Sequence, residues 1–342
     1  MTILPLPKGR TMARAVSFAG EDVLGLAEAG RIAPARCLWT AGVPELVREP
    51  PGFEPWGGCR GELVGPVAVG ERQHAARRVM RDGRVALTDL HPALHATSCA
   101  TACADGRQVG YGQPGGQSGG APIERALLWS GTAASVVELA GPDPARQTRA
   151  LGLHGDVQVG EYGRNWSLQA AMWRGSSESI VVLHPAPPPG YPADGQVSTA
   201  SGAGDGQQVG MVAWKKKALA QPEMRAALWT GSAGSFVDLT PPRVKHAQAR
   251  ACAGGFQVGW VSDDANNAVT RAVLWQGSAA GSVDLHAVLP EPWNRSQAVD
   301  IRVEGGAVLV LGTVTQVVKE GHLDINKATQ IVVWEKWLVE GS

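Results

Sequence analysis

The sequence has no excess of charge of either sign, and this absence narrows the range of functions. Its 342 residues include 31 Lys and Arg against 31 Asp and Glu, which gives a formal net charge of zero. Proteins that bind nucleic acids or anionic membranes through electrostatics need a basic excess to displace counterions. We therefore expect neither a nucleic-acid partner nor a membrane partner.

Long hydrophobic runs are absent as well. No stretch reaches the roughly 18 consecutive apolar residues of a membrane span, and the first residues, Met1 to Lys8, lack the apolar core of a signal peptide. We expect a cytoplasmic protein. Cysteine is scarce: five residues, an odd number, with one short C-x3-C spacing at Cys99 and Cys103, favour reduced thiols over a disulfide framework.

What the sequence does contain is a repeated phrase, Gln-Val-Gly. Successive copies, counted with their looser versions, stand about 40 to 53 residues apart, which is the length of a propeller blade. The phrase and its looser copies end at Gly25, Gly65, Gly110, Gly160, Gly210, Gly259 and Gly312. The spacing predicts seven repeats.

A second phrase follows in each repeat. Arg-Ala-x-Leu-Trp-x-Gly includes Trp129, Trp229 and Trp275, and a Val-Asp-Leu phrase comes after it. Weaker copies contain Trp39, Trp173 and Trp334, whereas Met80 takes the Trp position in the second repeat. Each repeat offers four short apolar runs broken by Gly, Pro and polar residues, which is typical of four strands joined by turns.

These patterns predict an all-β protein: one seven-bladed β-propeller domain of four-stranded antiparallel blades. The first strand of each repeat is rich in Ala, Gly, Ser and Cys, as the crowded centre of a ring requires, and the repeat Trp fits the wider outer gap between blades. We therefore expect the repeat Trp residues to be buried. The predicted blades span 10–51, 52–94, 95–144, 145–193, 194–242, 243–293 and 294–342.

The last repeat is short of one strand after Ile331 to Trp334. The N-terminal residues 1–9 contain Ile3 to Pro7, which match the Val-Asp-Leu-Thr-Pro segment that starts at Val237. We expect these residues to close the ring by adding a strand to the last blade, which would protect exposed edges. The alternative is that Trp337 to Val339 supply that strand locally.

The Gln-Val-Gly, Arg-Ala-Leu-Trp-x-Gly and Val-Asp-Leu-His-Pro phrases together resemble the HAF-type repeats of bacterial proteins. The resemblance covers about residues 10 to 337. It implies a propeller and no particular activity, because members of this family generally have no assigned biochemical function. It brings no catalytic residues.

Histidine and cysteine recur at positions that the repeat explains. His91, His95, Cys99 and Cys103 are spaced by four, but the repeat places them on extended chain, where four residues span roughly 13 Å, too far for one zinc ion. His91, His184 and His286 share one repeat position at a turn, so we expect a structural role. The sequence predicts no metal site and no cofactor.

The connections between the second and third strands differ from repeat to repeat. In an up-and-down blade they emerge on one face together with the connections between blades, and variable loops on a rigid scaffold commonly bind ligands. One of these connections contains an Asp-rich run, Asp263 to Asn267, whose spacing does not match the twelve-residue calcium-binding loop. The candidate binding residues are Arg164, Asn165, Trp166, Trp214, Lys215, Lys216, Lys217, Asp263, Asp264, His322 and Asp324.

Two classes of function remain open. The first is a non-enzymatic binding or scaffold module, a monomer that holds a protein, peptide or glycan on this face. It is favoured because the sequence lacks a phosphate-binding G-x-x-x-x-G-K loop. The alternative is an enzyme, a hydrolase or lyase, with its site in the axial funnel near Arg149, Arg250, Asp300 and His322.

Overall fold

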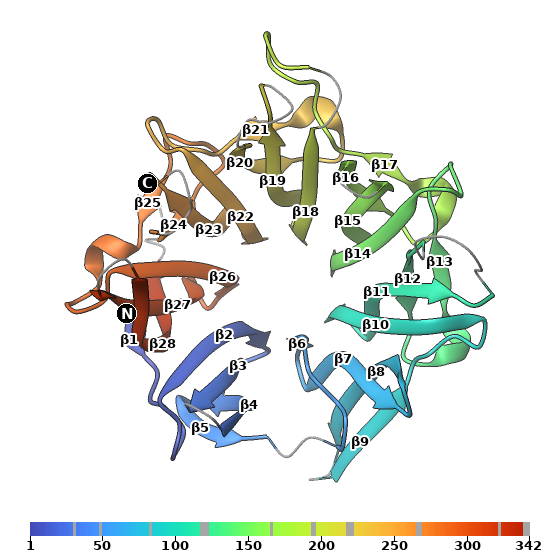
Figure 1. Ribbon diagram of the computed structural model, residues 1–342, viewed down its shortest axis with the longest axis horizontal. Helices are drawn as coiled ribbons and strands as arrows, with labels where there is room; N and C mark the ends of the chain where they lie inside the picture. Colours follow the sequence, from blue (N-terminus) through green and yellow to red (C-terminus); the bar gives the residue numbers. More distant parts are fainter. Residues whose placement is uncertain are drawn as a thin grey trace. The chain divides into compact units, whose positions relative to one another are not determined.

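The computed structural model shows an all-β protein (Figure 1). Its described residues contain β-strands and four short 3-10 helices, η1 (Ala133–Ser135), η2 (Ser177–Ser179), η3 (Ala233–Ser235) and η4 (His286–Val288). Within them no helix is long and apolar enough to span a bilayer. The structure describes residues 1–29, 32–47, 50–81, 84–116, 123–164, 167–192, 196–216, 222–264, 269–320 and 323–337.

Five four-stranded sheets occupy the described middle of the chain, and each falls within one predicted repeat between residues 52 and 293. Within each sheet the strands follow chain order. The strands are β6 (Gly57–Cys59), β7 (Glu62–Val69), β8 (Arg72–Arg81), β9 (Arg84–Asp89), β10 (His95–Ala104), β11 (Arg107–Pro114), β12 (Arg125–Trp129), β13 (Val137–Leu139), β14 (Gln147–His154), β15 (Val157–Arg164), β16 (Ser167–Trp173), β17 (Val181–Val182), β18 (Val197–Gly204), β19 (Gln207–Trp214), β20 (Glu223–Trp229), β21 (Val237–Asp238), β22 (His246–Ala253), β23 (Phe256–Ser262), β24 (Arg271–Trp275) and β25 (Val283–Asp284).

The two ends of the chain share an eight-stranded sheet. A single parallel bridge, Met12 to Thr329, joins its two halves. β1 pairs antiparallel with β28 through Thr2 and Ile3, which confirms that N-terminal residues add a strand to the last repeat (Figure 1). The strands are β26 (Arg295–Glu304), β27 (Ala307–Glu320), β28 (Leu323–Trp337), β1 (Thr2–Ile3), β2 (Met12–Ala19), β3 (Asp22–Ala29), β4 (Ile32–Thr40) and β5 (Val43–Leu46).

The chain divides into two compact units. Unit 1 comprises Met1–Val47, Met224–Leu228 and Val237–Ser342, and unit 2 comprises Arg48–Glu223 and Trp229–Phe236. In unit 1, β26 contacts both β2 and β22, the first strands of two other repeats. These three strands position the candidate site described below.

Local packing and hydrogen bonding explain why Gln and Gly recur in the repeat phrase. In β11, β15, β19 and β23 the glycine lies opposite the first strand, where an added Cβ would come within 1.9 Å of a backbone oxygen. The preceding Gln side chains are buried, and each accepts a hydrogen bond from the glycine N–H that follows the repeat Trp, at 2.7 to 2.9 Å. The phrase therefore serves backbone packing and needs no ligand to explain it.

The repeat Trp side chains are buried, as the sequence predicted. Trp129, Trp229 and Trp275 are each 0% exposed. Trp129 packs with Val64 and Ala75 of the preceding sheet, so it fills the gap between two successive sheets. Burial of such a large aromatic side chain supplies much of the hydrophobic stabilisation of each repeat.

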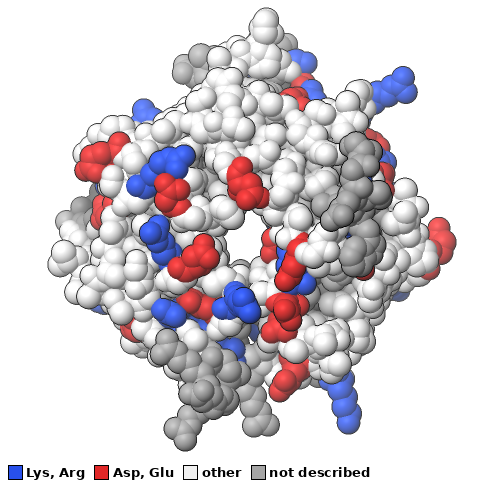
Figure 2. All heavy atoms as spheres, turned by 180° about the vertical axis from the view of Figure 1, so that it is seen from behind, with Lys and Arg blue, Asp and Glu red and all other residues white. Residues whose placement is uncertain are grey.

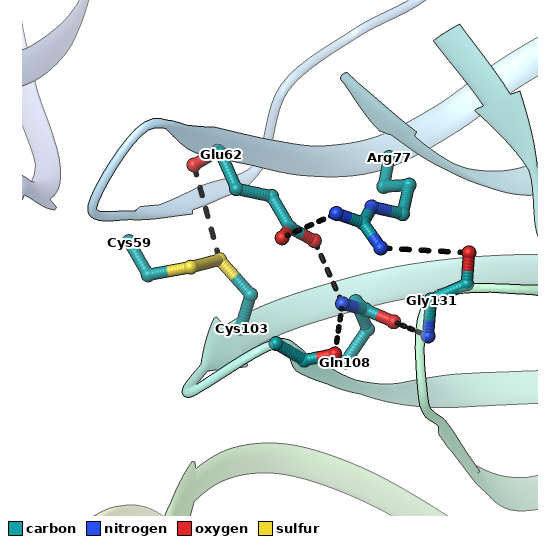
Figure 3. Close-up of a disulfide and its surroundings, with 7 residues drawn as sticks. Cys59, Glu62, Arg77, Cys103, Gln108 and Gly131 are labelled. Carbon is teal, nitrogen blue, oxygen red and sulfur yellow. Dashed lines mark hydrogen bonds and ion pairs between the residues drawn. A yellow bond between two sulfur atoms is a disulfide. The ribbon is translucent and has the colours of Figure 1, made fainter. Parts of the chain in front are cut away.

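One prediction about cysteine is wrong. Cys59 and Cys103 form a disulfide between β6 and β10, with their Cα atoms 5.7 Å apart (Figure 3). Their separation of 44 positions hides this proximity in the sequence, because it arises only when the first strands of two repeats lie side by side. Cys37, Cys99 and Cys252 form no disulfide and are buried.

The disulfide lies beside a buried polar cluster (Figure 3). The Glu62 carboxylate accepts a hydrogen bond from Gln108 Nε2 at 2.8 Å and lies 3.1 Å from Arg77. Burial raises the pKa of Glu62, and Arg77 opposes that rise. The disulfide and this cluster connect the same two sheets, so both hold them in register.

Candidate functional site

Charged side chains of both signs lie close together on the face shown in Figure 2, and most of that surface is uncharged. The predicted loop residues form pairs of this kind. Arg164 Nη2 lies 3.4 Å from Asp143 Oδ2, and Lys216 Nζ lies 3.1 Å from Glu223 Oε1 and 5.3 Å from the centre of the Tyr191 ring. Exposed pairs contribute only about 0 to 1 kcal/mol, so they indicate no partner.

Trp214 lies inside unit 2. It is the last residue of β19, is 4% exposed and packs edge-on against His184, with ring centroids 5.7 Å apart. The next residue, Lys215, donates its backbone N–H to Gln196 Oε1 at 2.7 Å. This placement gives Trp214 a packing role. Asn165, Trp166, Lys217 and His322, which the sequence also singled out, lie outside the described residues.

The acidic candidates of unit 1 contact nearby basic and polar groups. Asp263 Oδ2 accepts a hydrogen bond from Arg271 at 2.9 Å, and the backbone N–H of Asp264 donates to Ser262 Oγ at 3.2 Å. Asp324, on β28, pairs with Arg295 at the start of β26. Arg295, the basic member of this last pair, also lines a pocket.

A pocket of about 400 Å³ lies in unit 1, at the ends of the strands where the variable connections emerge. Thr270 follows the connection between β23 and β24, and Asn326 belongs to the β27–β28 hairpin. The lining residues are Arg14, Ala15, Arg250, Thr270, Arg295, Ser296, Gln297, Val299, Thr313, Thr315, Asn326 and Thr329.

Arg250 stands out in this lining because of its place in β22. The pairing of β22 with β23 skips one residue between Ala249 and Ala251, so Arg250 is the extra residue of a β-bulge, a device that redirects a side chain. The first strands β2, β10, β14, β18 and β26 have a bulge at the same repeat position. The residues there are Val16, Thr101, Leu151, Ser201 and Val299, all uncharged.

The Arg250 guanidinium has no compensating group. It makes no hydrogen bond or ion pair with any described residue, and its Nε is buried. Burial lowers the pKa of Arg250, and no carboxylate opposes that effect. A partly buried cation without a partner loses some of its hydration, and a ligand with a negative charge would compensate for that loss.

The other two arginines of the pocket are already paired. Arg14 Nε lies 3.9 Å from Glu28 Oε1, and Arg295 pairs with Asp324. Neither carboxylate lines the pocket. Three guanidinium groups and two paired carboxylates leave one positive charge, which belongs to Arg250.

The rest of the lining consists mostly of neutral polar groups. Thr313 Oγ1 accepts a hydrogen bond from the backbone N–H of Ala15 at 3.0 Å, which leaves its hydroxyl proton available. Thr315 and Thr329 hydroxyls lie 3.4 Å apart, and Gln297 Nε2 donates to Thr270 Oγ1 at 3.3 Å. Among the described lining residues there is no Asp, Glu, His, Lys, Cys or Tyr, the side chains that commonly act as general acid or base.

Of the residues named for the enzyme alternative, Arg250 lines the pocket, Arg149 and Asp300 have separate structural partners, and His322 lies outside the described residues. Arg149 belongs to unit 2, where it pairs with Glu124 and lies over the Tyr111 ring. Asp300 accepts hydrogen bonds from the backbone N–H groups of Phe18 and Ile301, each at 2.8 Å. Burial raises the pKa of Asp300 to about 6. Asp300 does not line the pocket.

The repeat histidines also have structural partners. Nδ1 of His91, His184 and His286 lies within hydrogen-bond distance of a serine hydroxyl on the following first strand, at 2.7, 2.8 and 2.9 Å. Burial lowers the pKa of all three imidazoles. Among the described residues no group of His, Cys, Asp and Glu could hold a metal ion.

No family model and no curated protein sequence matches the chain. In fold it is similar to a prolyl endopeptidase (TM-score 0.56, 10% identity), which it matches over 96% of its own length and 50% of that chain. It is also similar to oligopeptidase B from Trypanosoma brucei (TM-score 0.50, 10% identity), which it matches over 95% of its own length and 49% of that chain. A third similar structure is an acylaminoacyl peptidase from Pyrococcus horikoshii (TM-score 0.50, 9% identity), matched over 96% of this chain and 53% of that chain. The chain thus spans about half the length of these peptidases.

At this level of identity the similarity concerns the fold alone: the chain has a β-propeller-like all-β fold. The pocket was only partly visible in the sequence. Arg14 and Arg250 depart from the small residues of the first strands, which is a usable signal, whereas Arg295 and the threonines carry no signal of their own. Their convergence depends on how β2, β22, β26, β27 and β28 pack.

Proposed function

We propose that this protein is a non-enzymatic binding module, a seven-bladed β-propeller, that holds a small anionic ligand in the pocket of unit 1. The observation that supports this most directly is the Arg250 guanidinium, a partly buried cation without a counter-charge in a cavity of about 400 Å³. That volume is at the lower end of the range of ligand sites, about 300 to 1,000 Å³.

The chemistry of the lining favours binding over catalysis. Guanidinium, hydroxyl and amide groups hold and orient an anion, but they do not move protons readily near neutral pH. The variable connections at the mouth of the pocket would then set which ligand enters. The enzyme alternative shares Arg250 but has less support, because Asp300 and Arg149 are engaged in contacts elsewhere and neither lines the pocket.

The test is a thermal-unfolding titration of the full chain with inorganic phosphate, acetate and glucuronate. A ligand that binds only the folded state raises the melting temperature in a saturable manner. We expect at least one anion to do so, and we expect Arg250→Gln to abolish the effect. Arg174→Gln is the matched control, since Arg174 is exposed in unit 2 and its guanidinium pairs with Asp156. Equal responses in wild type and Arg250→Gln would refute the proposal.

A further inference from the structure

We infer that the pocket of unit 1 is specific for a hydroxylated monocarboxylate of monosaccharide size, an acidic sugar. This inference rests on the proposed anion site and names the chemical class of its ligand. Three features of the pocket support it: its single uncompensated charge, its many neutral hydrogen-bonding groups and its small apolar area.

The charge of the pocket selects a monoanion. Arg14 and Arg295 each have a carboxylate partner, Glu28 and Asp324. A ligand with one negative charge neutralises Arg250 and leaves both of these pairs in place. A phosphate monoester carries nearly two charges near neutral pH, so its second charge would meet only guanidinium groups that already have a carboxylate partner.

The geometry of a guanidinium also suits a carboxylate. Arginine offers parallel N–H donors that match the two oxygens of a carboxylate. The Nε of Arg250 is buried, so a carboxylate in the pocket would accept hydrogen bonds from the two Nη groups of the guanidinium. This pairing would place the ligand carboxylate at the bulge of β22.

The neutral polar side chains of the pocket favour a ligand with hydroxyl groups. Threonine hydroxyls and the side-chain amides of Gln297 and Asn326 both donate and accept hydrogen bonds, as ligand hydroxyls do. The Thr315 and Thr329 hydroxyls lie 3.4 Å from each other, at the weak limit of a hydrogen bond, so both can bind a ligand hydroxyl instead. Polyhydroxylated ligands match such a lining.

The apolar lining is too small for a hydrophobic ligand. Only Ala15 and Val299 contribute aliphatic side chains, and no aromatic ring lines the pocket within the described residues. A fatty acid or an aromatic acid would bury apolar surface against hydroxyl and guanidinium groups, which gives little hydrophobic gain. The pocket therefore discriminates against acids of the same charge that lack hydroxyls.

The experiment is isothermal titration of the full chain with four probes: D-glucuronate, cyclohexanecarboxylate, D-glucose and D-glucose 6-phosphate. Cyclohexanecarboxylate keeps the ring and the charge without the hydroxyls, whereas glucose keeps the hydroxyls without the charge. We expect glucuronate to bind at least about 10-fold more tightly than each of the others, and Arg250→Gln to weaken it about 10- to 100-fold. Thr315→Val should weaken glucuronate but leave cyclohexanecarboxylate unchanged.

The outcomes separate the two proposals. If glucose 6-phosphate or cyclohexanecarboxylate binds as tightly as glucuronate, and Arg250→Gln abolishes that binding, the anion site stands and the acidic-sugar class is wrong. If none of the charged probes and no inorganic phosphate binds, both proposals fail. If glucose binds as tightly as glucuronate, the charge of Arg250 is irrelevant and both proposals are again refuted.

Discussion

Gln208 Oε1 accepts a hydrogen bond from the backbone N–H of Gly231 at 2.7 Å, while its Nε2 donates to the carbonyl of Gly206 at 3.1 Å. The side chain is 1% exposed. It therefore joins the turn before β19 to the turn after β20 within one repeat. The same pair of contacts recurs at Gln108, Gln158 and Gln257.

Replacing this amide should cost stability without affecting ligand binding. Gln208→Met keeps the volume but leaves the Gly231 N–H and the Gly206 carbonyl without partners, and each lost partner of a buried group costs about 1 to 3 kcal/mol. We expect the free energy of unfolding, measured by urea titration, to fall by about 2 to 4 kcal/mol. A change below about 0.5 kcal/mol would show that water replaces the amide.

The glycine of the repeat phrase should tolerate no side chain. At Gly210 an added Cβ would lie 1.8 Å from the Thr199 carbonyl oxygen, whereas at Gly234 it would meet nothing within 4 Å. We expect Gly210→Ala to lower the free energy of unfolding by about 3 kcal/mol or more, because backbone must move. The matched control Gly234→Ala should change it by less than about 1 kcal/mol. Equal effects of the two substitutions would contradict this explanation.

The repeat Trp residues should dominate the packing energy. Trp229→Ala removes a side chain that is 0% exposed, and deleting a large buried aromatic typically costs about 3 to 5 kcal/mol. Urea midpoints of wild type and variant measure the loss. Trp56→Ala is the control, since Trp56 is 39% exposed and should matter far less. A loss below about 1 kcal/mol at Trp229 would mean that this residue is not part of the core.

The disulfide should make stability depend on reductant. Closing a loop with a disulfide typically stabilises a protein by about 2 to 4 kcal/mol, and Cys59 and Cys103 are 44 residues apart. We expect dithiothreitol to lower the unfolding midpoint of wild type and of Cys99→Ala, which keeps the disulfide. It should have no effect on the double variant Cys59→Ala, Cys103→Ala. Five reactive thiols in denatured protein without reductant would show that the disulfide does not form.

Asp300 should destabilise the protein at neutral pH. Burial raises its folded-state pKa to about 6, above the usual unfolded value of about 3.9. The folded state therefore binds more protons between these values, so the contribution of Asp300 to stability improves as the pH falls from about 7 to 4. We expect this contribution to the free energy of unfolding to increase by about 1 to 3 kcal/mol over that pH range.

Other groups titrate in the same window, so the comparison requires a variant. The partly buried His91, His184 and His286 have lowered pKa values, so their contribution to the free energy of unfolding becomes less favourable as the pH falls. The difference in unfolding free energy between wild type and Asp300→Asn isolates the carboxyl. A difference that stays constant from pH 7 to pH 4 would mean that the pKa of Asp300 is ordinary.

The sequence by itself determined the all-β character and, between residues 52 and 293, the division into four-stranded sheets. Gln-Val-Gly, the repeat Trp and Val-Asp-Leu are local requirements of strand pairing, turn geometry and core packing, and they return in most repeats because the same contacts return. The small first strands and the pairing of the N-terminal residues with β28 could be predicted for the same reason.

Only the tertiary structure decided which departures from the repeat meet. Cys59 and Cys103 form a disulfide because two first strands lie side by side, and Arg14, Arg250 and Arg295 surround one pocket because β26 contacts both β2 and β22. Trp214 looked like a loop residue but is buried, since β19 extends to include it. These outcomes depend on distances between residues far apart in the chain, which a local pattern does not encode.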